Sequence, residues 1–344
     1  MLTERQKQIL LAIIDDYIIS AEPVGSRTVS KKKGVGYSAA TIRNEMADLE
    51  EMGFLEQPHT SAGRIPSQKG YRFYVDHLLT PYMWTKEDLL ALHKHYSMRI
   101  DRVEQAIQHT TSILSKMTNY MTMILGPTIS ENNLKHLQIV PLFDRSAVSI
   151  LVTDTGHVHQ HRVTFPEGVS LSTIEKLVNL LNHRLTGVPI SKMKEVVARE
   201  LSDELMRYVD HYEKLTELVD QILQTEQDTQ RVYTSGATRM LEQPEFRDVE
   251  KMKSLLDLME KNETIIQLLR PESSGVQVRI GQEIRLEEIN DCSIITASYT
   301  IHGEPVGTIG VLGPTRMDYG RVISLIDFLA KDFSKRLSTL YDGE

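Results

Sequence analysis

The chain has 344 residues and a formal net charge of −8, with 40% hydrophobic and 25% charged residues, which is ordinary for a folded protein of two or three domains. Its single cysteine, Cys292, excludes an intramolecular disulfide framework and is typical of a reducing compartment. Acidic residues interrupt the apolar N-terminal stretch and no apolar run approaches membrane-spanning length, so we expect a cytoplasmic protein with no signal peptide and no membrane contact.

The charge is unevenly distributed along the chain. Residues 1–80 contain ten Lys or Arg and ten Asp or Glu, so the whole acidic excess lies after residue 80. Within this neutral segment, residues 26–44 and 57–75 carry basic side chains and no carboxylate, and acidic residues gather between them. This sorting predicts that one helix end and one hairpin face a polyanion, while the acidic remainder is repelled from phosphate.

The apolar spacing in residues 1–80 predicts three helices followed by a hairpin, which is the order of a winged helix-turn-helix domain. Thr3, Ser26 and Ser38 are the expected N-caps of the three helices. Short strands at 54–57 and 64–66 form the expected wing, and a closing helix follows. The alternative interpretation is a protein–protein adaptor in which the lysine run is only a solvated face.

The third helix is the expected recognition helix. Its buried stripe begins at Ala39, which leaves small and polar side chains on the opposite face. Arg43 can bind guanine and Asn44 can bind adenine, each through two hydrogen bonds, and the helix N-terminus favours phosphate. The expected contacts with double-stranded DNA are therefore Arg27, Lys31, Ser38, Thr41, Arg43, Asn44 and, on the wing, Arg64.

Four segments resemble a known family: 23–31 (PVGSRTVSK), 38–76 with the run PHTSAGRIP, 247–261, and 313–319 (GPTRMDY). In them the chain is similar to the HrcA family of heat-inducible transcription repressors, over essentially its whole length. The resemblance implies repression of chaperone operons by a homodimer bound to an inverted-repeat operator called CIRCE. It also implies that the chaperonin GroEL supports the active state, so that heat or chaperonin shortage derepresses the genes.

The pattern beyond residue 80 indicates an α+β chain with an interrupted sheet. In chain order it predicts two helices within 86–123, three strands within 137–165 and a helix at 172–185. A helical block follows at 187–269, then three strands within 276–312 and a final helix at 319–340. With the resemblance, the expected domains are a winged helix (1–80), a GAF-like α/β sheet domain in two parts (86–186 and 273–344) and a mostly helical inserted dimerisation domain (187–272). A tandem of two separate domains is the alternative.

The helical block contains the expected dimer contact. Its apolar side chains exceed what an isolated helical block should need: Leu255, Leu256, Leu258, Met259, Ile265, Ile266 and Leu268. The alternative is that these residues pack internally or onto the sheet.

Residue types that carry chemistry are few. His157, His159 and His161 alternate along a strand, but no Cys or acidic cluster completes a metal-ligand set, so we expect an exposed polar strand face. Cys292 lies in an apolar strand and is expected to be inert. No nucleophile stands in a recognisable motif, and we expect no enzyme activity, metal or cofactor. A regulator whose GAF-like domain binds a small molecule remains the alternative function.

Overall fold

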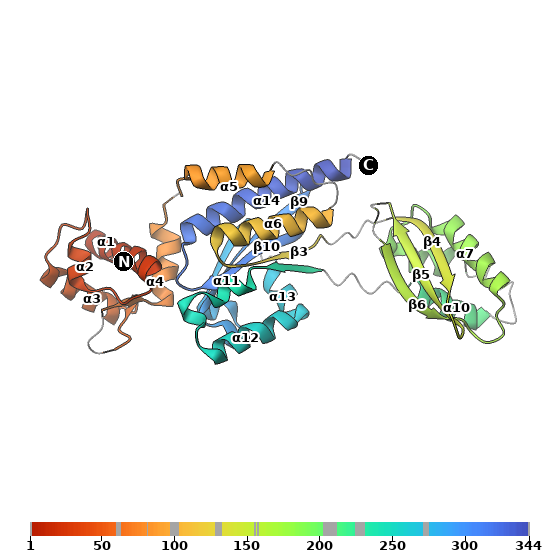
Figure 1. Ribbon diagram of the computed structural model, residues 1–344, viewed down its shortest axis with the longest axis horizontal. Coiled ribbons are helices and arrows are strands. Elements are labelled where there is room, and N and C mark those ends of the chain that lie inside the picture. The colour runs from red at the N-terminus through yellow and green to blue at the C-terminus, as the bar shows by residue number, and fades with distance from the viewer. Residues whose placement is uncertain are drawn as a thin grey trace. The chain divides into compact units, whose positions relative to one another are not determined.

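The computed structural model describes residues 2–59, 63–80, 82–96, 103–127, 133–154, 156, 158–201, 212–223, 231–270 and 275–342. The chain is α+β and forms two compact units (Figure 1). Unit 1 combines Met1–Gly126 with Val232–Leu340, and unit 2 consists mainly of Pro127–Arg231. Among the described helices, none is long and apolar enough to cross a membrane.

The first eighty residues form the expected three helices and hairpin. Their elements are α1 (Glu4–Ser20), α2 (Ser26–Ser30), α3 (Ala39–Glu51), β1 (Leu55–Glu56), β2 (Ile65–Pro66), α4 (Gln68–Phe73) and a π-helical continuation, η1 (Tyr74–Leu78). Thr3 caps α1 in a capping box with Gln6, and Ser38 caps α3. The expected cap at Ser26 is wrong, because Gly25 holds the cap position of α2 and Ser26 is its first helical residue.

An antiparallel five-stranded sheet forms the rest of unit 1, in the order β7-β3-β10-β9-β8. The strands are β3 (Met121–Leu125), β7 (Val232–Ser235), β8 (Val276–Ile280), β9 (Cys292–Ile301) and β10 (Glu304–Pro314). Helices α6 (Val103–Thr118) and α14 (Tyr319–Asp342) cover one face, and α12 (Val249–Glu260) and α13 (Asn262–Leu269) cover the other (Figure 1). Two short segments complete this part, α5 (Lys86–Tyr96) and α11 (Ala237–Leu241).

Strand β3 replaces the end of a helix that was expected to run to residue 123. Asn119, with a φ of 61°, ends α6, and all five β3 side chains are buried. Ile124 packs toward α6 and α14, whereas Met123 and Leu125 pack toward α12 and α13. A strand buried on both faces reads as a continuous apolar run, which periodicity cannot separate from a buried helix.

Unit 2 has its own three-stranded antiparallel sheet, β4-β5-β6. Its elements are β4 (Leu134–Pro141), β5 (Ser146–Thr153), β6 (Val158–Thr164), α7 (Leu171–Leu185), α8 (Met193–Val196), a π-helical segment (Val197–Leu201) and α10 (Tyr212–Ile222). Leu137, Leu151 and Val163 from the three strands share a core with α7 and α10. The second sheet therefore has one covered face.

The division differs from the expected insertion at 187–272. The three strands β4 to β6 pair with one another and belong to unit 2, so the insertion begins near Pro127. The chain leaves the large sheet after β3 and returns in β7, its antiparallel neighbour. Residues 232–269 then belong to unit 1, where the expected helical block also contains strand β7.

The apolar residues proposed from sequence as a dimer contact pack onto the large sheet instead. Leu255, Leu258, Ile265 and Leu268 are buried in the core between α12, α13 and the sheet, while Leu256 stays exposed. The alternative left open by the sequence is therefore confirmed. Helices α12 and α13 thus bury the apolar face of the five-stranded sheet opposite α6 and α14.

Candidate nucleic-acid interface

Helix α3 presents one buried and one exposed face. Ile42 and Leu49 are fully buried against α1, whereas Ala40, Arg43 and Asn44 are exposed. The Ser38 hydroxyl accepts a hydrogen bond from the Thr41 backbone N–H (3.1 Å) and shares another with the Thr41 hydroxyl (2.9 Å). Ser38 and Thr41 thus fix the start of the helix, while Arg43 and Asn44 point away from the core.

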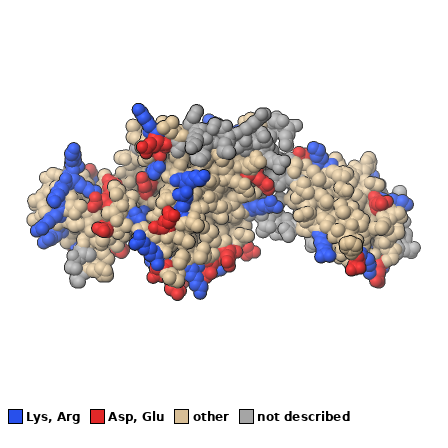
Figure 2. Space-filling model, viewed as in Figure 1, with Lys and Arg blue, Asp and Glu red and all other residues tan. Residues whose placement is uncertain are grey.

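Four cations of the winged helix are exposed: Arg27, Lys31, Lys33 and Arg43. None of them forms an ion pair with a residue that the structure describes. Lys32 differs, because its Nζ binds Ala12 O (2.9 Å) and Asp16 Oδ1 (2.8 Å). Figure 2 shows Lys and Arg side chains on the surface of the winged helix. Lys33 belongs to the basic stretch 26–44 but was not among the expected DNA contacts, because its sequence context does not distinguish it from Lys32.

Two of the four carboxylates in α3 are neutralised inside the protein. Glu45 is buried and pairs with Arg5 of α1, and Glu50 pairs with Arg64 beside the wing. Asp48 and Glu51 remain exposed in the later turns. The N-terminal half of α3 therefore carries the charge of Arg43, while ion pairs neutralise two of the four carboxylates that follow it in the helix.

The cations of the second basic stretch have partners within the protein. The Arg64 guanidinium binds Glu50, and Lys69 Nζ donates to Met52 O (2.7 Å) at the end of α3 and lies over the Phe54 ring. Arg72 donates to Glu283 Oε1 (2.9 Å) and to Val278 O (2.6 Å). All three cations of residues 57–75 are bound to protein groups.

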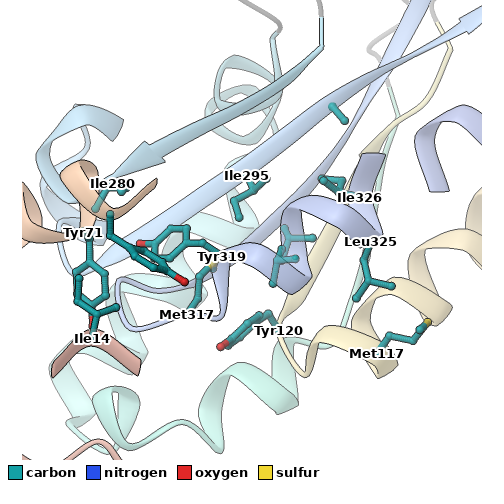
Figure 3. Close-up of a cluster of buried hydrophobic side chains, with 14 of the residues drawn as sticks. Ile14, Tyr71, Met117, Tyr120, Ile280, Ile295, Met317, Tyr319, Leu325 and Ile326 are labelled. Atoms are coloured by element: carbon teal, nitrogen blue, oxygen red, sulfur yellow. The ribbon is translucent and has the colours of Figure 1, made fainter. Parts of the chain in front are cut away.

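The closing helix of the winged helix packs against the large sheet within unit 1 (Figure 3). The ring centroids of Tyr71 and Tyr319 are 5.8 Å apart. Arg316 Nη1 donates a hydrogen bond to Ile18 O (2.5 Å) in the last turn of α1. Gln68 Nε2 donates to Asn290 O (3.0 Å) and accepts from the backbone N–H of Gln282 (3.0 Å). We call this set of contacts the module–sheet joint.

Tyrosines of the joint lie in a low-dielectric environment. Burial raises the pKa of Tyr74 to about 12, and the nearby carboxylates of Asp15 and Asp318 act in the same direction. Burial also raises the pKa of Tyr319 well above its ordinary value, although its hydroxyl shares a hydrogen bond with Ser293 (2.7 Å). These phenols stay neutral and serve packing.

The histidine strand and the cysteine do not form a metal or nucleophile site among the described residues. His159 and His161 are half-buried on the covered face of the small sheet, where they pair with Leu151 and Ser149 of β5. The prediction that these histidines lie on an exposed strand face is therefore wrong. His157 lies outside the described residues. The described part of the chain has no group of three His, Cys, Asp or Glu able to hold a metal. Burial raises the pKa of Cys292 to about 12, which makes its thiol inert.

Comparisons with known proteins agree with this geometry. The family "Winged helix-turn-helix transcription repressor, HrcA DNA-binding" matches residues 1–76, and "HrcA protein C terminal domain" matches residues 104–323. The chain belongs to the HrcA family. Its members are heat-inducible transcription repressors with a winged-helix DNA-binding domain, and not enzymes.

Two HrcA relatives match the full length of the chain. It is 50% identical over 342 residues to the heat-inducible transcription repressor HrcA of Brevibacillus brevis, covering 99% of this chain and 100% of the relative. It is also 50% identical over 341 residues to that of Halalkalibacterium halodurans, covering 99% of each. A crystal structure titled only as a hypothetical protein shares the fold, with a TM-score of 0.68 and 23% identity over 99% of this chain and 100% of that chain.

Proposed function

We propose that α3 enters the major groove of the operator and that the cationic edge beside it contacts the phosphate backbone. Arg43 and Asn44 read bases, because a guanidinium and an amide can each make two hydrogen bonds to guanine or adenine. Arg27, Lys31 and Lys33 contact phosphate, and Ser38 and Thr41 bring the α3 N-terminus to it. The observation that carries this proposal is a set of four exposed cations, Arg27, Lys31, Lys33 and Arg43, that form no ion pair with a residue the structure describes.

The operator in this proposal is the inverted repeat CIRCE, bound by a homodimer. One winged helix reads only a few base pairs, and two-fold doubling provides the affinity and specificity that a genome requires. We place the dimer contact on unit 2, whose small sheet has one uncovered face. Val140 and Val158 are exposed there, and Phe143 at the β4–β5 hairpin is 89% exposed.

Regulation in this proposal acts through folding. We regard the five-stranded sheet domain as GAF-like, but filled rather than ligand-binding. A methyl group at Gly310 would lie 2.4 Å from Leu269 Cδ2, and one at Gly307 would lie 2.3 Å from the Tyr299 hydroxyl. Such packing favours control by stability over control by a small molecule. Heat or shortage of GroEL in the cytoplasm then lowers the folded dimeric fraction, and repression is lost.

A binding titration tests the proposal. Purified protein is titrated against CIRCE DNA and a scrambled duplex at two salt concentrations, before heating and after heating and cooling with or without GroEL. We expect tight binding to CIRCE alone, and recovery after heating that depends on the chaperonin. Equal affinity for both duplexes would refute the base-reading role of α3, and full recovery without chaperonin would refute control by folding.

A further inference from the structure

The root of the wing is locked to the rest of the winged helix by its backbone. Arg64 exchanges two hydrogen bonds with Val24, N–H to carbonyl in both directions, each 2.9 Å. Gly63 passes so close to this point that an added Cβ would lie 2.4 Å from the Val24 carbonyl carbon. Only glycine permits this approach, so the start of β2 is held against the segment that joins α1 to α2.

The Arg64 side chain turns the other way, to the recognition helix. Its Nε and Nη2 each lie 2.7 Å from Glu50 Oε2, and the side chain is only 19% exposed. Glu50 stands in the last turn of α3, at the opposite end from Ser38. A charge-assisted contact of this kind is short and directional, and therefore fixes orientation as well as distance. Arg64 thus connects three elements: the α1–α2 segment, the wing and α3.

Lys69 strengthens the same connection from the far side of the wing. It donates to Met52 O at the C-terminal end of α3 and covers the Phe54 ring at the entry to β1. Both Arg64 and Lys69 therefore bind groups at the C-terminal end of α3.

We propose that Arg64 is a positioning residue, which sets the angle between the wing and the recognition helix through Glu50 and does not bind phosphate. This inference rests on the proposed function of α3 as the base reader. It assigns a new role to Glu50 as well, because a carboxylate on a DNA-binding helix would otherwise only repel the operator. Removing Glu50 should then weaken binding although it removes a negative charge.

The test is a double-mutant cycle with a matched control. Glu50→Gln, Arg64→Met and the double variant are titrated against CIRCE DNA, beside Glu51→Gln, which removes the same charge from an exposed neighbouring position. We expect Glu50→Gln and Arg64→Met each to lose roughly tenfold in affinity, the fold-change of one charge-assisted hydrogen bond. The double variant should lose no more than either single one, and Glu51→Gln should bind as tightly as the parent or more tightly.

Two further measurements separate positioning from phosphate binding and from simple stability. The salt dependence of binding should be unchanged in Arg64→Met, whereas loss of a phosphate contact lowers its slope by about 1. Hydroxyl-radical protection should weaken beside the half-site, where the wing lies, and persist in the major groove. Binding is measured well below the unfolding temperature of each variant, so that a loss of stability alone leaves affinity unchanged.

The outcomes are distinct. Tighter binding by Glu50→Gln, together with a lower salt slope for Arg64→Met, would overturn the inference and make Arg64 a phosphate contact. Unchanged affinity in both single variants would also overturn it. Failure of the parent protein to discriminate CIRCE from scrambled DNA would instead refute the proposed function.

Discussion

Arg316 offers the sharpest test of the module–sheet joint. Its guanidinium donates to Glu245 Oε1 (2.7 Å), to Gln243 Oε1 (3.3 Å) and to Ile18 O at the end of α1 (2.5 Å). The substitution Arg316→Met keeps the length of the side chain but removes all of these donors. Glu245 then loses its partner ion, and the last turn of α1 loses its hydrogen bond from the Arg316 side chain.

The expected cost follows from burial. The Arg316 side chain is 10% exposed and that of Glu245 is 21% exposed. Breaking a buried ion pair costs about 3–5 kcal/mol, and we take the lower end, about 3 kcal/mol, because part of Glu245 still reaches water. For a domain of this size each kcal/mol shifts the unfolding midpoint by about 2–4 °C, so we expect a fall of about 6–12 °C.

Calorimetry of the full-length protein measures the midpoint, and operator titration over the same temperatures shows whether DNA release moves with it. The control is Lys331→Met, which removes an exposed pair with Asp327 on α14 and should change the midpoint little. If Arg316→Met and the control had the same midpoint, the joint would not contribute to stability as argued. If the midpoint fell but DNA release did not move with it, the joint would not couple the sheet to the DNA-binding module.

Three other predictions can be checked with single variants or a single reagent. Arg43→Ala or Asn44→Ala should each cost about 1–3 kcal/mol of discrimination between CIRCE and scrambled DNA, and an equal loss on both duplexes would contradict base reading. Burial alone would raise the pKa of Asp88, but hydrogen bonds from Tyr82, Thr85 and Arg321 outweigh it and lower the pKa to about 2. Because the pKa of Asp88 is lower in the folded than in the unfolded protein, its ionised form stabilises the fold above about pH 4, and this stabilisation is lost as the pH falls toward about 2. Asp88→Asn should therefore lower the free energy of unfolding by roughly 2 kcal/mol at neutral pH and make it less dependent on pH in acid. An unchanged urea midpoint would argue against this role of Asp88. Cys292 is the only cysteine and is buried, so a thiol reagent should label the protein only as unit 1 opens, and fast labelling of the native protein would contradict its burial.

The winged helix could be predicted from sequence because its signals are local. Thr3 and Ser38 are caps that act within one turn, and the spacing of Ile42, Met46 and Leu49 specifies the buried face of α3 without reference to other parts of the chain. The exposed positions of Arg43 and Asn44 follow from the same periodicity. The order of three helices and a hairpin then leaves few topologies.

The insertion and the role of Arg64 depend on contacts between residues far apart in sequence. Strands β3 and β7 are neighbours in the sheet although about a hundred residues separate them, and neither strand alone indicates its partner. Arg64 and Lys69 resemble phosphate contacts until their partners at the end of α3 are seen, because positive charge near a hairpin is common to both roles. Charge sorting thus predicts a DNA-facing surface, but it cannot distinguish exposed cations such as Arg27 and Arg43 from cations such as Arg64 that pair within the domain.

Two of the segments that carry the family resemblance, 38–76 and 313–319, meet at the joint. The run 313–319 supplies Arg316 and Tyr319, and the closing helix of the winged helix supplies Tyr71, which is buried in contact with Tyr319. Under the proposed control by folding, opening of the sheet domain would remove Tyr319 from Tyr71 and expose apolar side chains of the winged helix such as Ile14. The same transition would then weaken operator binding and create an apolar surface of the kind that chaperonins bind, so loss of repression and exposure of that surface should rise together with temperature.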